Sequence, residues 1–181
     1  MTDPRKLSPS TPPGRSWRPG RVLARVAVAT MVAMWVYVLY LAVGPGRQPP
    51  PDRLDDPAFA TEAQAICNAA HDDVDRLPSA SAAESAAERA GIVTEANERF
   101  AAMLDDLGRI VPAGDDGAIV EQWLADWRTY LVDRADFVDA LLEDPEAQLL
   151  VTAKDREQIT EFIDAFSADN RMTACATPID V

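Results

Sequence analysis

The chain contains 181 residues and has a formal net charge of −13 at pH 7. That length is enough for one membrane anchor and one compact domain, because domains usually take about 100 to 150 residues. Residues 1–25 carry six basic side chains and one acidic side chain, whereas residues 57–181 carry nine basic and twenty-six acidic side chains. So acidic a surface repels nucleic acid and anionic lipid headgroups, which excludes both as ligands of residues 57–181.

The N-terminal residues, 1–21, contain five prolines, several basic side chains and almost nothing apolar. This composition predicts a disordered tail. Residues 22–43 follow, and the last eighteen of them, Val26–Val43, carry no charge. A helix of eighteen residues is about 27 Å long, close to the roughly 30 Å thickness of the hydrocarbon core of a bilayer. We therefore predict a transmembrane helix over residues 22–43.

A cleaved secretory signal is the alternative interpretation of this segment. The apolar run is longer than the roughly 7 to 15 residues of a signal peptide, and small residues are poorly placed for cleavage after it, which favours an uncleaved anchor. Six basic side chains precede the segment, and only Arg47 and Arg53 follow it closely. By the positive-inside rule, this asymmetry predicts a single-pass protein of the cell membrane with a cytoplasmic N-terminus and an extracytoplasmic C-terminal domain.

Residues 44–55 are rich in proline and predict a short extended stalk before the outer domain, residues 56–181. The only two cysteines, Cys67 and Cys175, both fall in the outer domain. Thiols oxidise and stay oxidised outside the cytoplasm, so we predict a disulfide between them within one chain. A redox-active pair is more often a Cys-x-x-Cys motif.

Within residues 56–181, apolar residues recur at helical spacing in four stretches separated by prolines and turn residues. The predicted helices are residues 57–76, capped by Asp56; residues 81–107, opened by a Ser81–Glu84 capping box; residues 119–141; and residues 153–168, capped by Thr152. No run alternates as a half-buried strand does. The expected fold is therefore all-α: one N-terminal transmembrane helix followed by an extracytoplasmic antiparallel four-helix bundle.

Two polar residues, Asn97 and Arg134, occupy positions in otherwise apolar stripes of neighbouring helices. The favoured interpretation is that they set the register of the helices through hydrogen bonds, with Arg134 paired to a nearby carboxylate such as Asp133 or Glu98. The alternative is a polar pocket between the second and third helices of the bundle. Three aromatic side chains would contribute to such a pocket: Trp123, Trp127 and Tyr130.

Catalytic and metal-binding motifs are weak in this sequence. His71 and Asp75 are four residues apart, a spacing that can hold a divalent metal, but a solvated acidic turn explains the same residues. Bridged metal sites of helical bundles need histidines on two helices, and the chain has a single histidine. That histidine lies in a charged helical run, so no hydrolytic triad can be proposed either. We therefore expect no metal, no cofactor and no enzymatic activity.

These expectations lead to one functional hypothesis and one alternative. A bilayer-anchored outer domain without catalytic motifs is expected to act in protein–protein interaction or scaffolding of the bacterial envelope, with an envelope protein as its partner. The abundance of arginine over lysine is typical of a GC-rich bacterial genome. The alternative is a sensor or ligand-binding domain that uses the polar and aromatic pocket.

Overall fold

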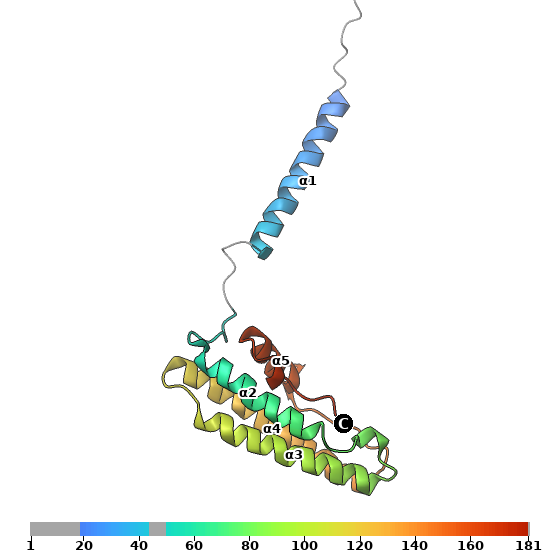
Figure 1. Cartoon of the computed structure of the whole chain (residues 1–181). Helices are drawn as coiled ribbons and strands as arrows, with labels where there is room; N and C mark the ends of the chain where they lie inside the picture. Colours follow the sequence, from blue (N-terminus) through green and yellow to red (C-terminus); the bar gives the residue numbers. More distant parts are fainter. Residues whose placement is uncertain (1–18, 44–49, 181) are drawn as a thin grey trace, which may run out of the picture. The chain divides into compact units, whose positions relative to one another are not determined.

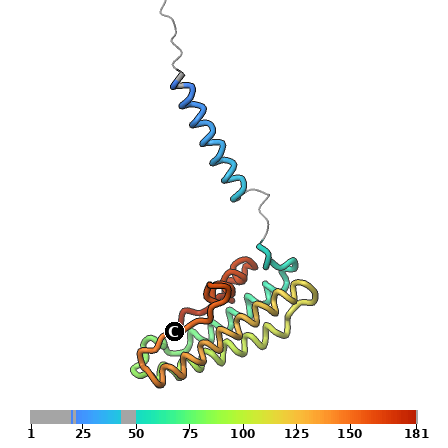
Figure 2. The backbone as a smooth tube through the Cα atoms, turned by 180° about the vertical axis from the view of Figure 1, so that it is seen from behind, coloured from blue at the N-terminus to red at the C-terminus, as the bar shows by residue number. Residues whose placement is uncertain are grey.

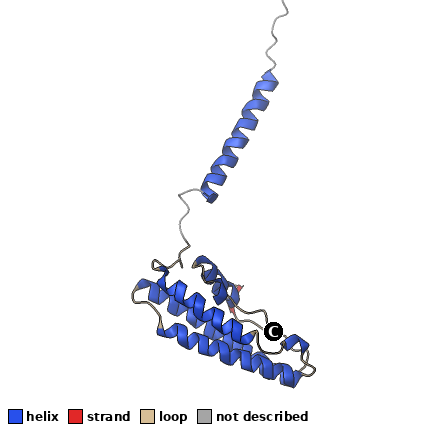
Figure 3. Ribbon diagram, viewed as in Figure 1, coloured by secondary structure: helices blue, strands red, loops and turns tan. Residues whose placement is uncertain are grey.

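The computed structural model describes residues 19–43 and 50–180, in two compact units that divide between Gln48 and Pro49. Most of the predicted tail and the first half of the predicted stalk lie outside the described residues. The described part is mostly helical, with 72 % helix and five α-helices (Figures 1 and 3). This confirms the expectation of a helical chain.

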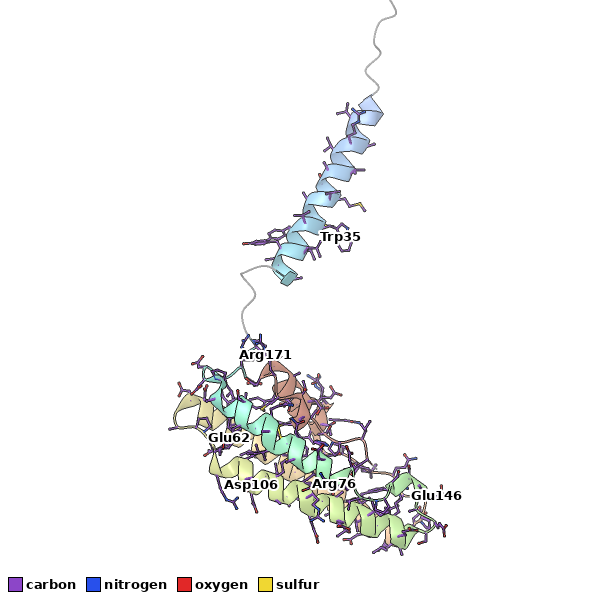
Figure 4. All side chains as sticks on the ribbon, in the orientation of Figure 1. Trp35, Glu62, Arg76, Asp106, Glu146 and Arg171 are labelled. Atoms are coloured by element: carbon purple, nitrogen blue, oxygen red, sulfur yellow. A yellow bond between two sulfur atoms is a disulfide. The ribbon has the colours of Figure 1, made fainter. Side chains whose placement is uncertain are left out.

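Helix α1, Pro19–Val43, is the only element of the first unit within the described residues. Its stretch Val22–Ala42 has a mean hydropathy of 2.0, and none of its side chains is buried in the molecule. Figure 4 shows Trp35 projecting freely from this helix. Among the described residues there is therefore one helix, near the N-terminus, that is long and apolar enough to cross a membrane, as the sequence predicts.

The second unit begins with helix α2, Pro57–Val74, which starts where the sequence predicts. The side chain of Asp56 accepts a hydrogen bond of 2.9 Å from the backbone N–H of Ala58, and Pro57 occupies the first turn, where its missing N–H costs nothing. The helix ends two residues earlier than predicted. Its buried face includes Phe59 and Cys67.

Helix α3, Ala86–Arg109, begins later than predicted because the motif Ser-Ala-Ala-Glu occurs twice. Ser81 lies in a short 3₁₀ turn, η1 (Ala80–Ala82), and does not cap the helix. Ser85 caps it instead: its Oγ accepts from the backbone N–H of Glu88 at 3.2 Å, while the Glu88 carboxylate accepts from the backbone N–H of Glu84 at 2.8 Å. The predicted motif was right in kind, and its second copy is used.

Helix α4, Asp115–Glu143, is the longest helix and begins four residues before the predicted start. Gly114 precedes it with a φ of 83°, a conformation that suits glycine. In its first turn, the Asp116 carboxylate accepts hydrogen bonds of 3.1 Å from the backbone N–H groups of Asp55 and Asp56. The beginnings of α2 and α4 are thereby tied together.

The predicted fourth helix is wrong in its first six residues. Two short antiparallel strands, β1 (Ala153–Lys154) and β2 (Glu157–Gln158), form a hairpin, and helix α5 (Ile159–Asp169) starts only after it. Thr152 does not cap a helix, because its backbone N–H and its hydroxyl both donate to the Asp133 carboxylate at 2.7 Å. These bonds to α4 hold the chain extended where the sequence pattern suggested a helix.

The three long helices of this unit, α2, α3 and α4, lie side by side, and α5 packs on α4 (Figures 1 and 2). A final 3₁₀ turn, η2 (Thr173–Cys175), contacts both α2 and α5. The main core lies between these elements and includes Phe100, Leu124 and Trp127. A smaller core lies between the first half of α3 and the end of α4 and is centred on Val93, Phe137 and Leu141.

Candidate functional site

The C-terminal end of the chain is held against the helices by a disulfide. Cys67 in α2 and Cys175 in η2 are paired, with 5.1 Å between their Cα atoms, and both side chains are fully buried. The hydroxyl of Ser167 also donates to the backbone carbonyl of Cys175 at 2.9 Å. The pairing agrees with the prediction, and it places the following residues, 176–180, beside α2 and α4.

Arg134, in the middle of α4, is the centre of a buried polar cluster. Its side chain has no exposed surface, yet all of its guanidinium nitrogens have partners. Nη1 and Nη2 donate to the two carboxylate oxygens of Asp180 at 2.7 and 2.8 Å. Nε donates to the side-chain carbonyl of Asn97 in α3 at 2.5 Å, and Nη1 also lies 3.4 Å from the Tyr130 hydroxyl. This bidentate geometry is the strongest form of carboxylate recognition by arginine.

The carboxylate that pairs with Arg134 is not the one expected. Asp133 is occupied by Thr152, and Glu98 is exposed on α3. The partner, Asp180, is 46 residues away in the sequence and lies beyond the last helix. Sequence periodicity could not find it, because the segment after α5 has no helical pattern that would predict its position.

The electrostatics of the cluster follow from its burial. Burial alone lowers the pKa of Arg134, but the hydrogen bonds and charge of Asp180, assisted by Tyr130, outweigh it and raise the pKa above its usual value. Burial raises the pKa of Tyr130, although Arg134 opposes the effect. The guanidinium also lies 5.5 Å from the centre of the Phe100 ring. Arginine stays fully charged here, so the cluster presents a permanent cation to one carboxylate.

The aromatic residues of the predicted pocket lie in the core. Trp127 packs against Phe100 and Tyr130, with ring centres 6.1 and 5.8 Å apart, and it has no exposed surface. Trp123 lies further along α4 and contacts Phe59 and Phe166 instead. The structure therefore brings together three of the five predicted residues, Asn97, Tyr130 and Arg134, with Trp127 behind them and Trp123 separate.

Two hollows border Asp180. One has a volume of about 400 Å³ and lies between the end of α2 and residues 173–180, with His71 and Thr177 in its wall. The other has a volume of about 240 Å³ and is mostly apolar, with Leu77, Pro78 and Ile92 in its wall. Asp180 lines both hollows, as do Val74 and Asp75 at the end of α2.

A third hollow, of about 340 Å³, lies between α4 and α5 beside Trp123 and Phe162. Lys154 borders it and donates to both oxygens of the Asp126 carboxylate at 2.9 and 2.7 Å. The ammonium group also lies 5.0 Å from the centre of the Phe162 ring. This cation is thus neutralised by its own chain.

His71 packs its ring edge-on against Phe100, with 5.4 Å between the ring centres. Among the described residues, no three histidine, cysteine, aspartate or glutamate side chains are grouped as a metal site requires. The chemistry that the Arg134 cluster can perform is recognition of a carboxylate. Comparison of the chain with protein-family models, with curated proteins and with solved structures gave no match.

Proposed function

We propose that this chain is a membrane-anchored module of the bacterial cell envelope, whose outer helical domain acts through protein–protein interaction or scaffolding. In this proposal α1 spans the cell membrane with the N-terminus in the cytoplasm. Helices α2 to α5 form an antiparallel four-helix bundle outside it. The bilayer and an envelope protein are its partners.

The observation that carries the proposal is the combination of the apolar helix α1 with a buried disulfide in the following unit. Structural disulfides persist in oxidising compartments and are rare in the cytoplasm. Cys67 and Cys175 have no exposed surface, so their bond belongs to the core of the unit rather than to a reactive surface. Together with the basic residues before α1, this supports an extracytoplasmic location for residues after α1.

The surface of the outer unit supports an interaction role over catalysis. Acidic side chains project from several of its elements, among them Glu62, Asp106 and Glu146 (Figure 4). The core is filled by aromatic contacts, and the buried Arg134 and Asp126 form ion pairs within the chain. A cationic or polar face on an envelope protein is the partner chemistry that such a surface favours.

Topology is tested with a protease-cleavable tag placed after Val181. In intact spheroplasts, added protease should remove the tag, and the protein should keep α1 and remain in the membrane fraction. The matched control carries the same tag before Met1 and should be protected. Protection of the C-terminal tag, or a mature N-terminus near Gly44, contradicts the topology.

Interaction is tested by site-specific photocrosslinking in the native membrane. A photoreactive amino acid is placed at exposed apolar positions of the outer unit, Val132, Leu142 and Leu150, which are 58, 60 and 82 % exposed. Matched control probes go to Trp35 in α1. A discrete adduct from the outer positions supports the proposal if changes that abolish the adduct also abolish rescue of the deletion phenotype. If none of the outer positions gives an adduct of defined mass, the result counts against the proposal.

A further inference from the structure

The buried cluster around Arg134 has the geometry of a carboxylate receptor whose ligand is supplied by the chain itself. Its donor, Arg134, lies in α4 and also donates to Asn97 of α3, whereas the carboxylate that it binds comes from the segment 176–180, which belongs to neither helix. Arg134 is fully buried, while the Asp180 side chain retains 23 % of its exposure. The receptor is thus part of the rigid core, and the carboxylate enters it from the surface.

Beyond Thr177, the segment that carries Asp180 is attached to the rest of the unit by one ion pair. The backbone N–H of Thr177 donates to the Asp164 carboxylate at 2.7 Å, and its hydroxyl bonds to the same group. Pro178 has no N–H to donate, and Ile179 leaves its whole side chain in solvent, at 101 % exposure. Of the described residues 178–180, only Asp180 makes side-chain hydrogen bonds to the rest of the unit.

Because one ion pair holds this segment, another carboxylate can replace that of Asp180 at Arg134. If residues 178–180 move away, the guanidinium of Arg134 remains buried beside Asn97 and Tyr130, and a buried charge without a partner is costly. A ligand carboxylate would restore the two lost hydrogen bonds. Cys175 stays fixed by the disulfide in either state, so the exchange needs only the last few residues to move.

The hollows that Asp180 borders indicate the rest of the ligand. The smaller one, of about 240 Å³, has Leu77, Pro78 and Ile92 in its wall beside Asp75, and these apolar side chains suit a short aliphatic chain. The high negative charge of residues 57–181 disfavours ligands with several anionic groups. The chemistry therefore favours a monocarboxylate that carries an apolar group.

We infer that the Arg134–Asn97–Tyr130 cluster is a binding site for a monocarboxylate with a short apolar chain, and that Asp180 occupies this site in competition with the ligand. The inference rests on the ligand-binding alternative and is independent of the interaction role of the outer surface. The carboxylate has two possible sources, a free organic acid or an acidic side chain of a peptide, and the experiment below distinguishes them.

The test uses the full chain in neutral maltoside micelles and isothermal titration calorimetry with sodium hexanoate. Asp180→Asn should bind hexanoate at least tenfold more tightly than the unmodified chain, because Asp180 no longer competes. The matched control, Asp169→Asn, removes an exposed carboxylate of α5 and should bind as the unmodified chain does. Adding Arg134→Leu to Asp180→Asn should abolish binding.

Three further probes define the ligand. Hexanamide, which lacks the charge, and acetate, which lacks the chain, should each bind Asp180→Asn at least tenfold more weakly than hexanoate. The peptide acetyl-Thr-Pro-Ile-Asp-amide reproduces residues 177–180. Tighter binding of this peptide than of hexanoate assigns the site to an acidic peptide segment, and the reverse order assigns it to a free acid.

A second variant tests whether the introduced asparagine side chain itself occupies the site. A stop after Thr177 removes residues 178–181 and keeps the disulfide, and it should bind hexanoate as tightly as Asp180→Asn. If both variants unfold, digestion of the unmodified chain with carboxypeptidase Y decides: saturating hexanoate should speed the release of Asp180 and Ile179. Equal hexanoate affinity in all folded variants, or an unchanged rate of release at saturation, overturns the inference.

Discussion

Replacement of Cys67 by alanine removes the covalent link between α2 and η2, and its cost can be calculated from the length of the loop that the bond closes. The two cysteines are 108 residues apart. The loop-entropy relation gives about 5 kcal/mol for a loop of that length, and removal of native disulfides commonly costs about 2 to 5 kcal/mol. We therefore expect Cys67→Ala to lower the free energy of unfolding by about 2 to 5 kcal/mol.

Cys175→Ala should cost nearly the same, because both substitutions remove one shared bond. The double variant should then lose no more than either single variant, which is the signature of a coupled pair. Both half-cystines have no exposed surface, so each alanine leaves a gap of similar size in the same core. Free thiols of the single variants are blocked with iodoacetamide to prevent dimers.

The assay is urea unfolding of the full chain in maltoside micelles, followed by tryptophan fluorescence. Trp123 and Trp127 are buried in the unit that follows α1 and report its unfolding, whereas Trp35 in α1 contributes a constant background. Losses that add up in the double variant would refute the shared-bond reasoning. So would free thiols in freshly denatured unmodified protein.

Five other substitutions test particular contacts by urea unfolding. Arg134→Leu should change the free energy of unfolding by less than ~1 kcal/mol, because the partly exposed Asp180 can return to water. Asp180→Ala should lower it by ~2 kcal/mol, because a buried guanidinium is left without its carboxylate. Equal losses from the two substitutions would contradict this asymmetry. Because the pKa of Tyr130 is raised in the folded state, its contribution to the free energy of unfolding is complete below about pH 10 and is lost as the pH rises through the folded pKa. Tyr130→Phe should therefore make the free energy of unfolding fall less steeply between about pH 9 and 11. Gly117→Ala should destabilise the protein by ~1 to 3 kcal/mol, because the new methyl group would overlap a backbone carbonyl of the preceding loop. Gly91→Ala in α3 is the control: its methyl group would enter open space, so it should stabilise the protein by ~0.5 to 1 kcal/mol.

The elements that the sequence predicted well are those fixed by local physics. Apolar periodicity located α2, α3 and α4, and Asp56 with Pro57 marked the start of α2 to the residue. The errors arose where local rules allowed two answers or where distant groups decided. The repeated Ser-Ala-Ala-Glu motif offered two helix starts, and Ser85 of the second copy caps the helix. At residues 153–158 the pattern allowed a helix, but two hydrogen bonds from Thr152 to Asp133, nineteen residues earlier, favoured a hairpin.

The candidate site shows the same division between local and distant causes. Its donor, Arg134, and one acceptor, Asn97, were visible in the sequence, because both interrupt apolar stripes, and a polar residue in such a stripe requires a partner. The identity of the carboxylate acceptor depended on the path of the chain after α5, which the disulfide directs back across α2. Asp180 can reach Arg134 only because Cys175, five residues before it, is fixed at the centre of the core. Prediction of the pair therefore required the disulfide to be treated as a geometric constraint on the C-terminal segment, and not only as a source of stability.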